Sequence, residues 1–131
     1  MMEWYDQYSV HIRQMDRQHR QILAILSRIY SLRESDRRGL ERVFSGLENY
    51  IRRHFRDEEQ LMRCHGYPGY PEQKREHEQF IDQICSYRKE FIKGTTPVMI
   101  NLFNNLWDWL AHHILLLDRR YMPFLREQGC R

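Results

Sequence analysis

Two residues that could bind a metal, His54 and Glu58, lie four positions apart in a segment with the apolar periodicity of an α-helix, so both face one side. The rest of that face is apolar: Leu40, Phe44, Leu47, Ile51, and Leu61 or Met62. A glutamate that faces a core is costly to bury unless a group of opposite charge pairs with it. An iron ion would be such a partner, because imidazole and carboxylate together suit iron. The alternative is a helix rotated so that both side chains reach water at the edge of the core.

Three more histidines, His19, His77 and His113, lie on the inward faces of three other helical segments. A single histidine on an apolar face is usually a satisfied core residue. Four of them, one per helix and accompanied by Glu58 and Asp118, would leave several buried polar groups in need of partners. Asp118 follows His113 by five residues, so both can face one metal pair only if the helix is locally widened, as in a π-bulge. The remaining histidines lie off these faces and are not expected to be ligands: His11, His65 and His112.

Four amphipathic segments would position these side chains, at about 16–34, 37–64, 72–93 and 97–121. The stretch Tyr67-Pro68-Gly69-Tyr70-Pro71 predicts a turn between the second and third segments, and Gly94-Thr95-Thr96-Pro97 a break before the fourth. Pro123 is expected to end or kink the last helix. Four helices with short connections predict an all-α fold, an up-down-up-down antiparallel four-helix bundle, preceded by an extended arm over about 1–14.

The composition is that of one globular, soluble domain over residues 1–131, with 41% hydrophobic and 30% charged residues. The net charge of +3 is small and the arginines are interleaved with acids, so nucleic-acid binding is not expected. The sequence has no apolar run of membrane-spanning length and no apolar signal-peptide core near its start, so no membrane partner is expected. Three widely spaced cysteines without a Cys-x-x-Cys pair favour a reduced, cytoplasmic protein without a thiolate zinc site: Cys64, Cys85 and Cys130.

The order of these residues along the chain resembles the hemerythrin family, and its bacterial branch especially. The matching segments are Met15-Asp16-Arg17-Gln18-His19, His54-Phe55-Arg56-Asp57-Glu58-Glu59, Tyr67-Pro68, Glu76-His77-Glu78-Gln79-Phe80, and Trp109-Leu110-Ala111-His112-His113-Ile114 with Asp118. The resemblance covers nearly the whole chain, and the combined spacing is specific although each segment alone is weak. Members of the family hold a non-haem di-iron centre inside the bundle and bind dioxygen at one iron. A ferritin-like di-iron oxidase is disfavoured, because Glu-x-x-His occurs nowhere in the sequence.

The resemblance implies six iron ligands: His19, His54, Glu58, His77, His113 and Asp118. The first two histidines would be terminal ligands of the iron that takes dioxygen, and the last two would bind the other iron. The two carboxylates would bridge the iron ions, together with an oxo or hydroxo group. The family pattern has a further histidine one turn before His77, where this chain has Gln73. A neutral amide is a poor iron ligand beside imidazole, so water or another exchangeable ligand is expected at the second iron.

Three functions of different classes follow from this resemblance. The first is a stand-alone dioxygen carrier or store. The second is an oxygen or redox sensor, in which small anions can also reach the iron and an attached C-terminal output domain receives the signal. The third is a metal-free helical interaction module. Gln73 disfavours the carrier, the retained ligands disfavour the metal-free module, and the sensor is the preferred prediction. The domain itself is not expected to be an enzyme.

Overall fold

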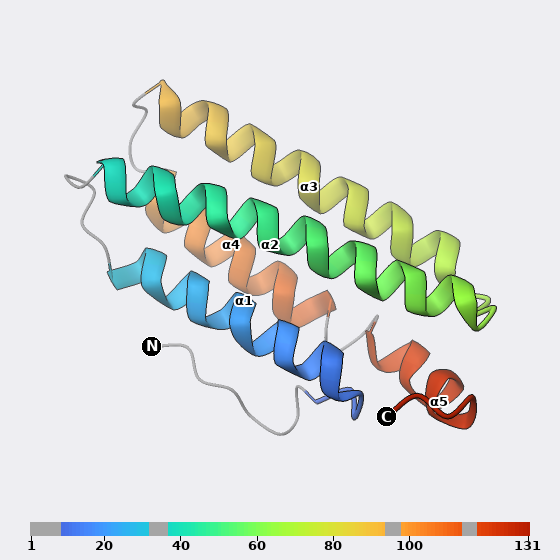
Figure 1. Cartoon of the computed structure of the whole chain (residues 1–131). Coiled ribbons are helices and arrows are strands. Elements are labelled where there is room, and N and C mark those ends of the chain that lie inside the picture. The colour runs from blue at the N-terminus through green and yellow to red at the C-terminus, as the bar shows by residue number, and fades with distance from the viewer. Residues whose placement is uncertain (1–8, 32–36, 94–97, 114–117) are drawn as a thin grey trace.

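The computed structural model describes residues 9–31, 37–93, 98–113 and 118–131. These residues form helices and turns and contain no β-strand. The helices are α1 (Arg13–Ser31), α2 (Arg37–Cys64), α3 (Tyr70–Ile92), α4 (Val98–His112) and α5 (Arg119–Glu127). Four long helices lie side by side, and the short α5 covers one end of them (Figure 1).

The four long helices close into a ring in which each one packs against two others: α1 against α2 and α4, and α3 against α2 and α4. Successive helices run in opposite directions (Figure 1). This arrangement confirms the predicted up-down-up-down four-helix bundle. No helix in the described part of the chain is both long and apolar enough to cross a membrane.

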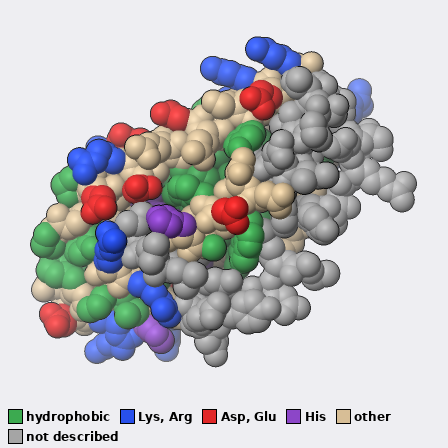
Figure 2. All heavy atoms as spheres, turned by 180° about the vertical axis from the view of Figure 1, so that it is seen from behind, with side chains coloured by type: hydrophobic (Ala, Val, Ile, Leu, Met, Phe, Trp, Pro, Cys, Tyr) green, Lys and Arg blue, Asp and Glu red, His purple; other side chains and the backbone are tan. Residues whose placement is uncertain are grey.

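The apolar faces predicted from the sequence form the core of the bundle. The buried members of these faces are Ile22, Leu23, Leu26, Ile29, Leu40, Phe44, Leu47, Ile51, Met62, Phe80, Ile84, Phe91, Leu106 and Leu110. On the face seen from behind, the coloured basic and acidic groups are interspersed (Figure 2). Leu61 and Tyr87 are only partly buried and pack against the core from its edge.

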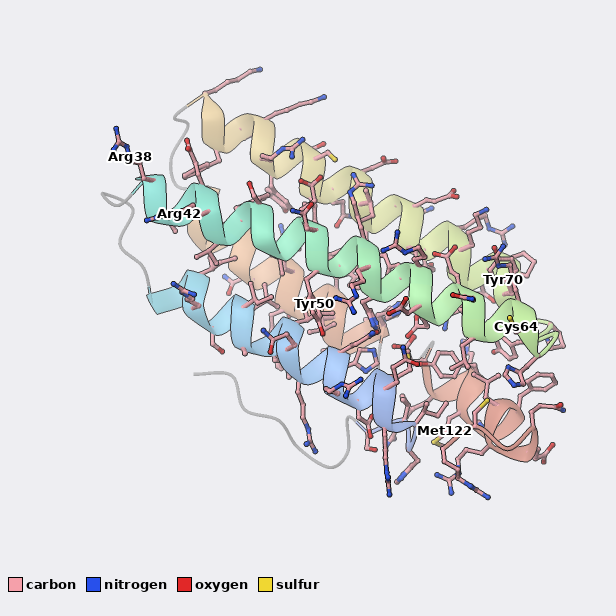
Figure 3. The ribbon with its side chains drawn as sticks, viewed as in Figure 1. Arg38, Arg42, Tyr50, Cys64, Tyr70 and Met122 are labelled. Carbon is pink, nitrogen blue, oxygen red and sulfur yellow. The ribbon has the colours of Figure 1, made fainter. Side chains whose placement is uncertain are left out.

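The second helix spans the predicted residues, and the predicted turn follows it. Gly66 has a φ of 68°, a left-handed conformation that favours glycine, and the Tyr67 amide donates to the Met62 carbonyl at 2.9 Å. The third helix begins at Tyr70 rather than at the predicted 72, because Pro71 fits its first turn, where a missing amide N–H is not needed. Cys64 and Tyr70 flank this turn, at the opposite end of α2 from Arg38 and Arg42 (Figure 3).

The start of the first helix was predicted too late, since α1 begins at Arg13 instead of 16. The carboxylate of Asp16 binds the chain that leads into the helix, accepting hydrogen bonds from Ser9 Oγ at 2.5 Å and from the Val10 amide at 2.8 Å. Val10 is itself fully buried. The arm is therefore shorter than predicted and its last residues pack against the core. Residues 1–8, 32–36 and 94–97, which include the predicted end of the first helix and the Gly-Thr-Thr-Pro break, lie outside the described residues.

The predicted fourth helix over 97–121 is wrong in one respect, because α4 ends at His112 and a separate helix, α5, runs from Arg119 to Glu127. The helix also continues past Pro123. The amide that Pro123 lacks would bond to the carbonyl of Arg119, so only one bond at the start of α5 is lost. The backbone has π-helical hydrogen bonding at both His113 and Asp118, which agrees with the predicted widening, and residues 114–117 lie outside the described residues.

Candidate metal centre

The six predicted ligands come together in the interior of the bundle. Their ligand atoms form two clusters, each within 4.8 Å, that share Glu58: one with His19, His54 and Asp118, the other with His77 and His113. All six side chains are buried, with exposed fractions of 0–2%. The alternative in which His54 and Glu58 reach water is therefore wrong. We call the His19/His54 side the first half-site and the His77/His113 side the second half-site.

The carboxylate of Glu58 faces both half-sites, one oxygen to each. Its Oε1 lies 2.9 Å from His77 Nε2 and 3.2 Å from His113 Nε2. Its Oε2 lies 3.4 Å from His54 Nε2 and 3.7 Å from His19 Nε2. A carboxylate in this position can donate one oxygen to each of two cations.

Asp118 has the same relation to the two half-sites. Its Oδ1 lies 2.8 Å from His113 Nε2, and its Oδ2 lies 3.0 Å from His19 Nε2. Asp118 is also the residue immediately before α5, so the π-helical backbone there sets the direction of its side chain. The widened backbone thus explains how a spacing of five residues brings Asp118 and His113 to one site.

Several buried polar atoms of this site have no hydrogen-bond partner. They include His19 Nε2, His54 Nε2 and Asp118 Oδ2, all of which belong to the first half-site. Buried polar atoms are normally paired, and leaving them unpaired costs free energy. A cation between these atoms would satisfy all three, so imidazole and carboxylate groups of this site fit metal ions such as iron.

Two histidines are held from behind by side chains that the sequence reasoning did not single out. His54 Nδ1 lies 2.6 Å from Gln18 Oε1, and Gln18 Nε2 in turn donates to Asp57 Oδ2 at 2.8 Å. His77 Nδ1 lies 2.9 Å from Glu59 Oε2. With the proton on Nδ1, both rings direct an unprotonated Nε2 at the centre. Asp57 and Glu59 are the immediate neighbours of Glu58 in the sequence. Acidic residues that flank a predicted ligand on the same helical turn are a signal that could have identified them.

Gln73 occupies the position that the sequence reasoning emphasised. It is 2% exposed and lies on α3 one turn before His77. Its Nε2 donates to Asp118 Oδ1 at 3.2 Å, and its Oε1 has no hydrogen-bond partner. The amide is therefore part of the second half-site, where it contacts a carboxylate rather than pointing away.

The ionisation of the histidines differs between positions. Burial would lower the pKa of His19, but the negative charges of Asp118 and Glu58 outweigh it and raise the pKa to about 9. Burial also disfavours a charged His113, whose pKa the same two carboxylates raise to about 10. For His54 burial dominates and lowers the pKa to about 3. A cation that binds here must displace the protons of His19 and His113, so binding depends on pH.

Aromatic rings enclose the second half-site. Phe55 stacks on His77 at 3.8 Å between ring centroids, and Trp109 stacks on His113 at 4.5 Å. Phe80 stacks in turn on Trp109 at 3.6 Å. Phe55 and Phe80 are buried and Trp109 is partly buried, so these rings restrict water around the histidines.

A groove of about 310 Å³ between α2 and α3 extends from the surface to the second half-site. Phe55 and His77 line its inner end, beside Glu59. Arginines and acids line its outer part: Arg52, Arg56, Arg63, Glu78 and Asp82. The second half-site is therefore buried but borders a groove that opens to the surface.

A four-helix bundle with two histidine pairs around two shared carboxylates has buried side chains that could hold metal ions. The chain belongs to the hemerythrin family, because the model of the hemerythrin HHE cation binding domain matches residues 10–125. This membership supports a non-haem di-iron centre that binds oxygen.

Individual proteins agree with this assignment. The bacteriohemerythrin of Stenotrophomonas maltophilia (strain R551-3) is 33% identical over 122 residues, which cover 92% of this chain and 79% of the relative. The myohemerythrin of Sipunculus nudus is 33% identical over 69 residues, which cover 53% of this chain and 52% of the relative. A crystal structure of wild-type hemerythrin superposes with a TM-score of 0.87 at 25% identity, over 95% of this chain and 98% of that one.

Proposed function

We propose that the six buried side chains bind two iron ions. His19 and His54 would hold one ion, His77 and His113 the other, and Glu58 and Asp118 would bridge them together with an oxo or hydroxo group. The observation that carries this proposal is that each carboxylate directs one oxygen at a histidine of the first half-site and the other oxygen at a histidine of the second. A centre of this kind supplies electrons to dioxygen and takes them back.

We further propose that the domain is an oxygen or redox sensor rather than a stand-alone dioxygen carrier or store. Gln73 supports this choice, because its Nε2 is engaged with Asp118 and its amide is a poor ligand. The second iron would then keep a position for water or a small anion. With iron bound, such a position would favour loss of oxygen as peroxide at the expense of two electrons from the iron ions, which would shorten storage but is compatible with sensing, since a sensor needs only two states that differ.

The signal would leave the site through α5. Asp118 directly precedes this helix, so a shift of the bridging carboxylate between oxidation states would displace the start of α5. An output domain attached at the C-terminus would receive that displacement, and any enzymatic activity would belong to that domain. The three free thiols, Cys64, Cys85 and Cys130, support the cytoplasm as the location.

Metal analysis tests the centre itself. Protein purified in air should contain two iron ions per chain and show the absorption bands of an oxidised di-iron centre. These bands should bleach on reduction. One zinc ion, or no metal after careful loading, would refute the di-iron proposal and favour a metal-free helical interaction module.

Stopped-flow spectroscopy tests the choice between sensor and carrier. The reduced wild type and Gln73→His are each mixed with oxygen, with Gln73→Ala as a control that removes the amide without adding an imidazole. We expect a short-lived oxygen-bound form in the wild type and a longer-lived one in Gln73→His only. A long-lived oxygen-bound form in the wild type, with the same lifetime in Gln73→His, would contradict the sensor proposal and favour a dioxygen carrier or store.

A further inference from the structure

Tyr121 is a buried phenol that contacts one of the two carboxylates of the centre. Its side chain is 0% exposed, and its hydroxyl donates a hydrogen bond to Glu58 Oε2 at 3.0 Å. That oxygen is the one that faces His54 and His19. The contact joins α5 to α2 across 63 positions of sequence, and the sequence pattern gave no sign of it.

The hydroxyl has a role that packing does not explain. Tyr121 lies in an aromatic cluster with Tyr67, whose ring is 6.3 Å away edge to face, and a phenylalanine would fill the same space. A buried hydroxyl needs a hydrogen-bond partner, and in the described part of the chain this partner is Glu58.

The two bridging carboxylates each receive one such bond, and the bonds fall on opposite half-sites. Tyr121 donates to the Glu58 oxygen of the first half-site, and Gln73 Nε2 donates to the Asp118 oxygen that faces His113 in the second. Asp118 Oδ2 lies 3.0 Å from the ligand histidine His19 and receives no hydrogen bond from a residue outside the ligand set. Each half-site therefore has one carboxylate oxygen whose charge is partly withdrawn by a donor and one whose charge is available to a metal.

We infer that Tyr121 is a positioning residue that orients Glu58 and raises the reduction potential of the centre. The inference rests on the proposed role of Glu58 as a bridge. A hydrogen bond withdraws charge from the carboxylate and makes it a weaker donor to a metal. The ferric ion depends more on donor charge than the ferrous ion does, so a weaker donor destabilises the oxidised state more than the reduced one.

Tyr121→Phe tests this inference because it removes only the hydroxyl. Tyr67→Phe is the matched control: it removes a hydroxyl from the neighbouring ring, which in the described residues makes no hydrogen bond with the centre. We expect both variants to retain two iron ions. At a fixed applied potential, the ratio of reduced to oxidised centre in Tyr121→Phe should fall roughly tenfold, the effect of one ordinary hydrogen bond. Tyr67→Phe should match the wild type.

A second replacement covers the case in which Tyr121→Phe loses iron. Site-specific 3-fluorotyrosine in place of Tyr121 keeps the ring and the hydroxyl but makes the phenol a stronger donor, so the midpoint potential should rise. Unchanged potentials and absorption bands in Tyr121→Phe and in the fluorinated protein, both with two iron ions, would refute the role of Tyr121 and leave the ligand assignment intact. A wild type that binds no iron would instead refute the ligand assignment.

Discussion

The two half-sites share their carboxylates but differ in much of what surrounds the histidines. In the first, His19 and His54 present unpartnered Nε2 atoms, and Gln18 holds His54 from behind. In the second, both histidines lie against aromatic rings, the Gln73 amide contacts Asp118, and a groove reaches His77. The shared residues could fix the distance between two bound metals, while the different surroundings would make those metals unequal. Inequality is useful in a sensor, because one metal can react while the other keeps an exchangeable position.

Removal of the shared carboxylate should abolish both half-sites at once. Glu58→Ala removes the group that both clusters contain, so we expect loss of both iron ions. Binding stabilises the folded state, by about 4 kcal/mol for one ion at a free concentration a thousand times its Kd, so the melting temperature should fall. Metal analysis and thermal unfolding measure the two effects.

Chelator-treated wild type is the control for Glu58→Ala. If the variant loses stability only through lost metal, it should melt close to the metal-free wild type. Retention of one iron ion by Glu58→Ala would show that the half-sites bind independently, contrary to a shared bridge.

The helices and five of the six inward side chains were predictable because they depend on local spacing, whereas Asp118 fits only with a local widening of its helix. His19, His54 and His77 continue apolar faces with helical periodicity, and burial of each face then directs them inward. The contacts with Gln18, Glu59 and Tyr121 were not predicted, because each depends on how two helices meet rather than on one helix face. The end of α4 was missed for a related reason. Apolar residues continue in step past His113, so periodicity gives no end to the helix there, although the spacing of His113 and Asp118 predicts a local widening.

The next largest effect on stability is expected from the aromatic rings beside the second half-site, Phe55, Phe80 and Trp109. Phe80→Ala removes a buried ring that stacks on Trp109, so we expect a loss of about 3–5 kcal/mol in the free energy of unfolding. Loss of that support should also let Trp109 move from His113, and the absorption bands should change. Chemical denaturation and spectroscopy measure these two results.

Phe44→Ala is the matched control for Phe80→Ala. Phe44 is equally buried, at 2% exposed, but stacks on Phe91 away from the centre. Phe44→Ala should lower the free energy of unfolding by a similar amount, while its iron content and absorption spectrum should match those of the wild type. Equal spectral changes in both variants would mean that any loss of core packing disturbs the centre. The aromatic rings beside the second half-site would then have no specific effect on it. A cost well below about 3 kcal/mol for Phe80→Ala would contradict its burial.

The smallest predicted effects distinguish the two half-sites best. They come from side chains that contact the Nδ1 atom of a single histidine. Gln18→Ala removes the partner of His54 Nδ1, and Glu59→Ala removes the partner of His77 Nδ1. Loss of such a partner typically costs roughly 10–100-fold in metal affinity, since the ring is no longer held in one orientation and tautomer. Each variant should therefore weaken one half-site and leave the ligands of the other in place.

Mössbauer spectroscopy of iron-57 protein can assign these effects, because it reports each iron ion separately. Gln18→Ala should alter the signal of one iron and Glu59→Ala the signal of the other, with chelator competition giving the loss of affinity. Glu59→Gln is the control for charge: its amide oxygen can still accept from His77 Nδ1, so affinity should recover if orientation is what matters. If Gln18→Ala and Glu59→Ala both changed the same iron, the division of histidines between two half-sites would be wrong. If Glu59→Gln lost as much metal affinity as Glu59→Ala, the negative charge of Glu59, rather than its hydrogen bond with His77, would be what supports metal binding at the second half-site.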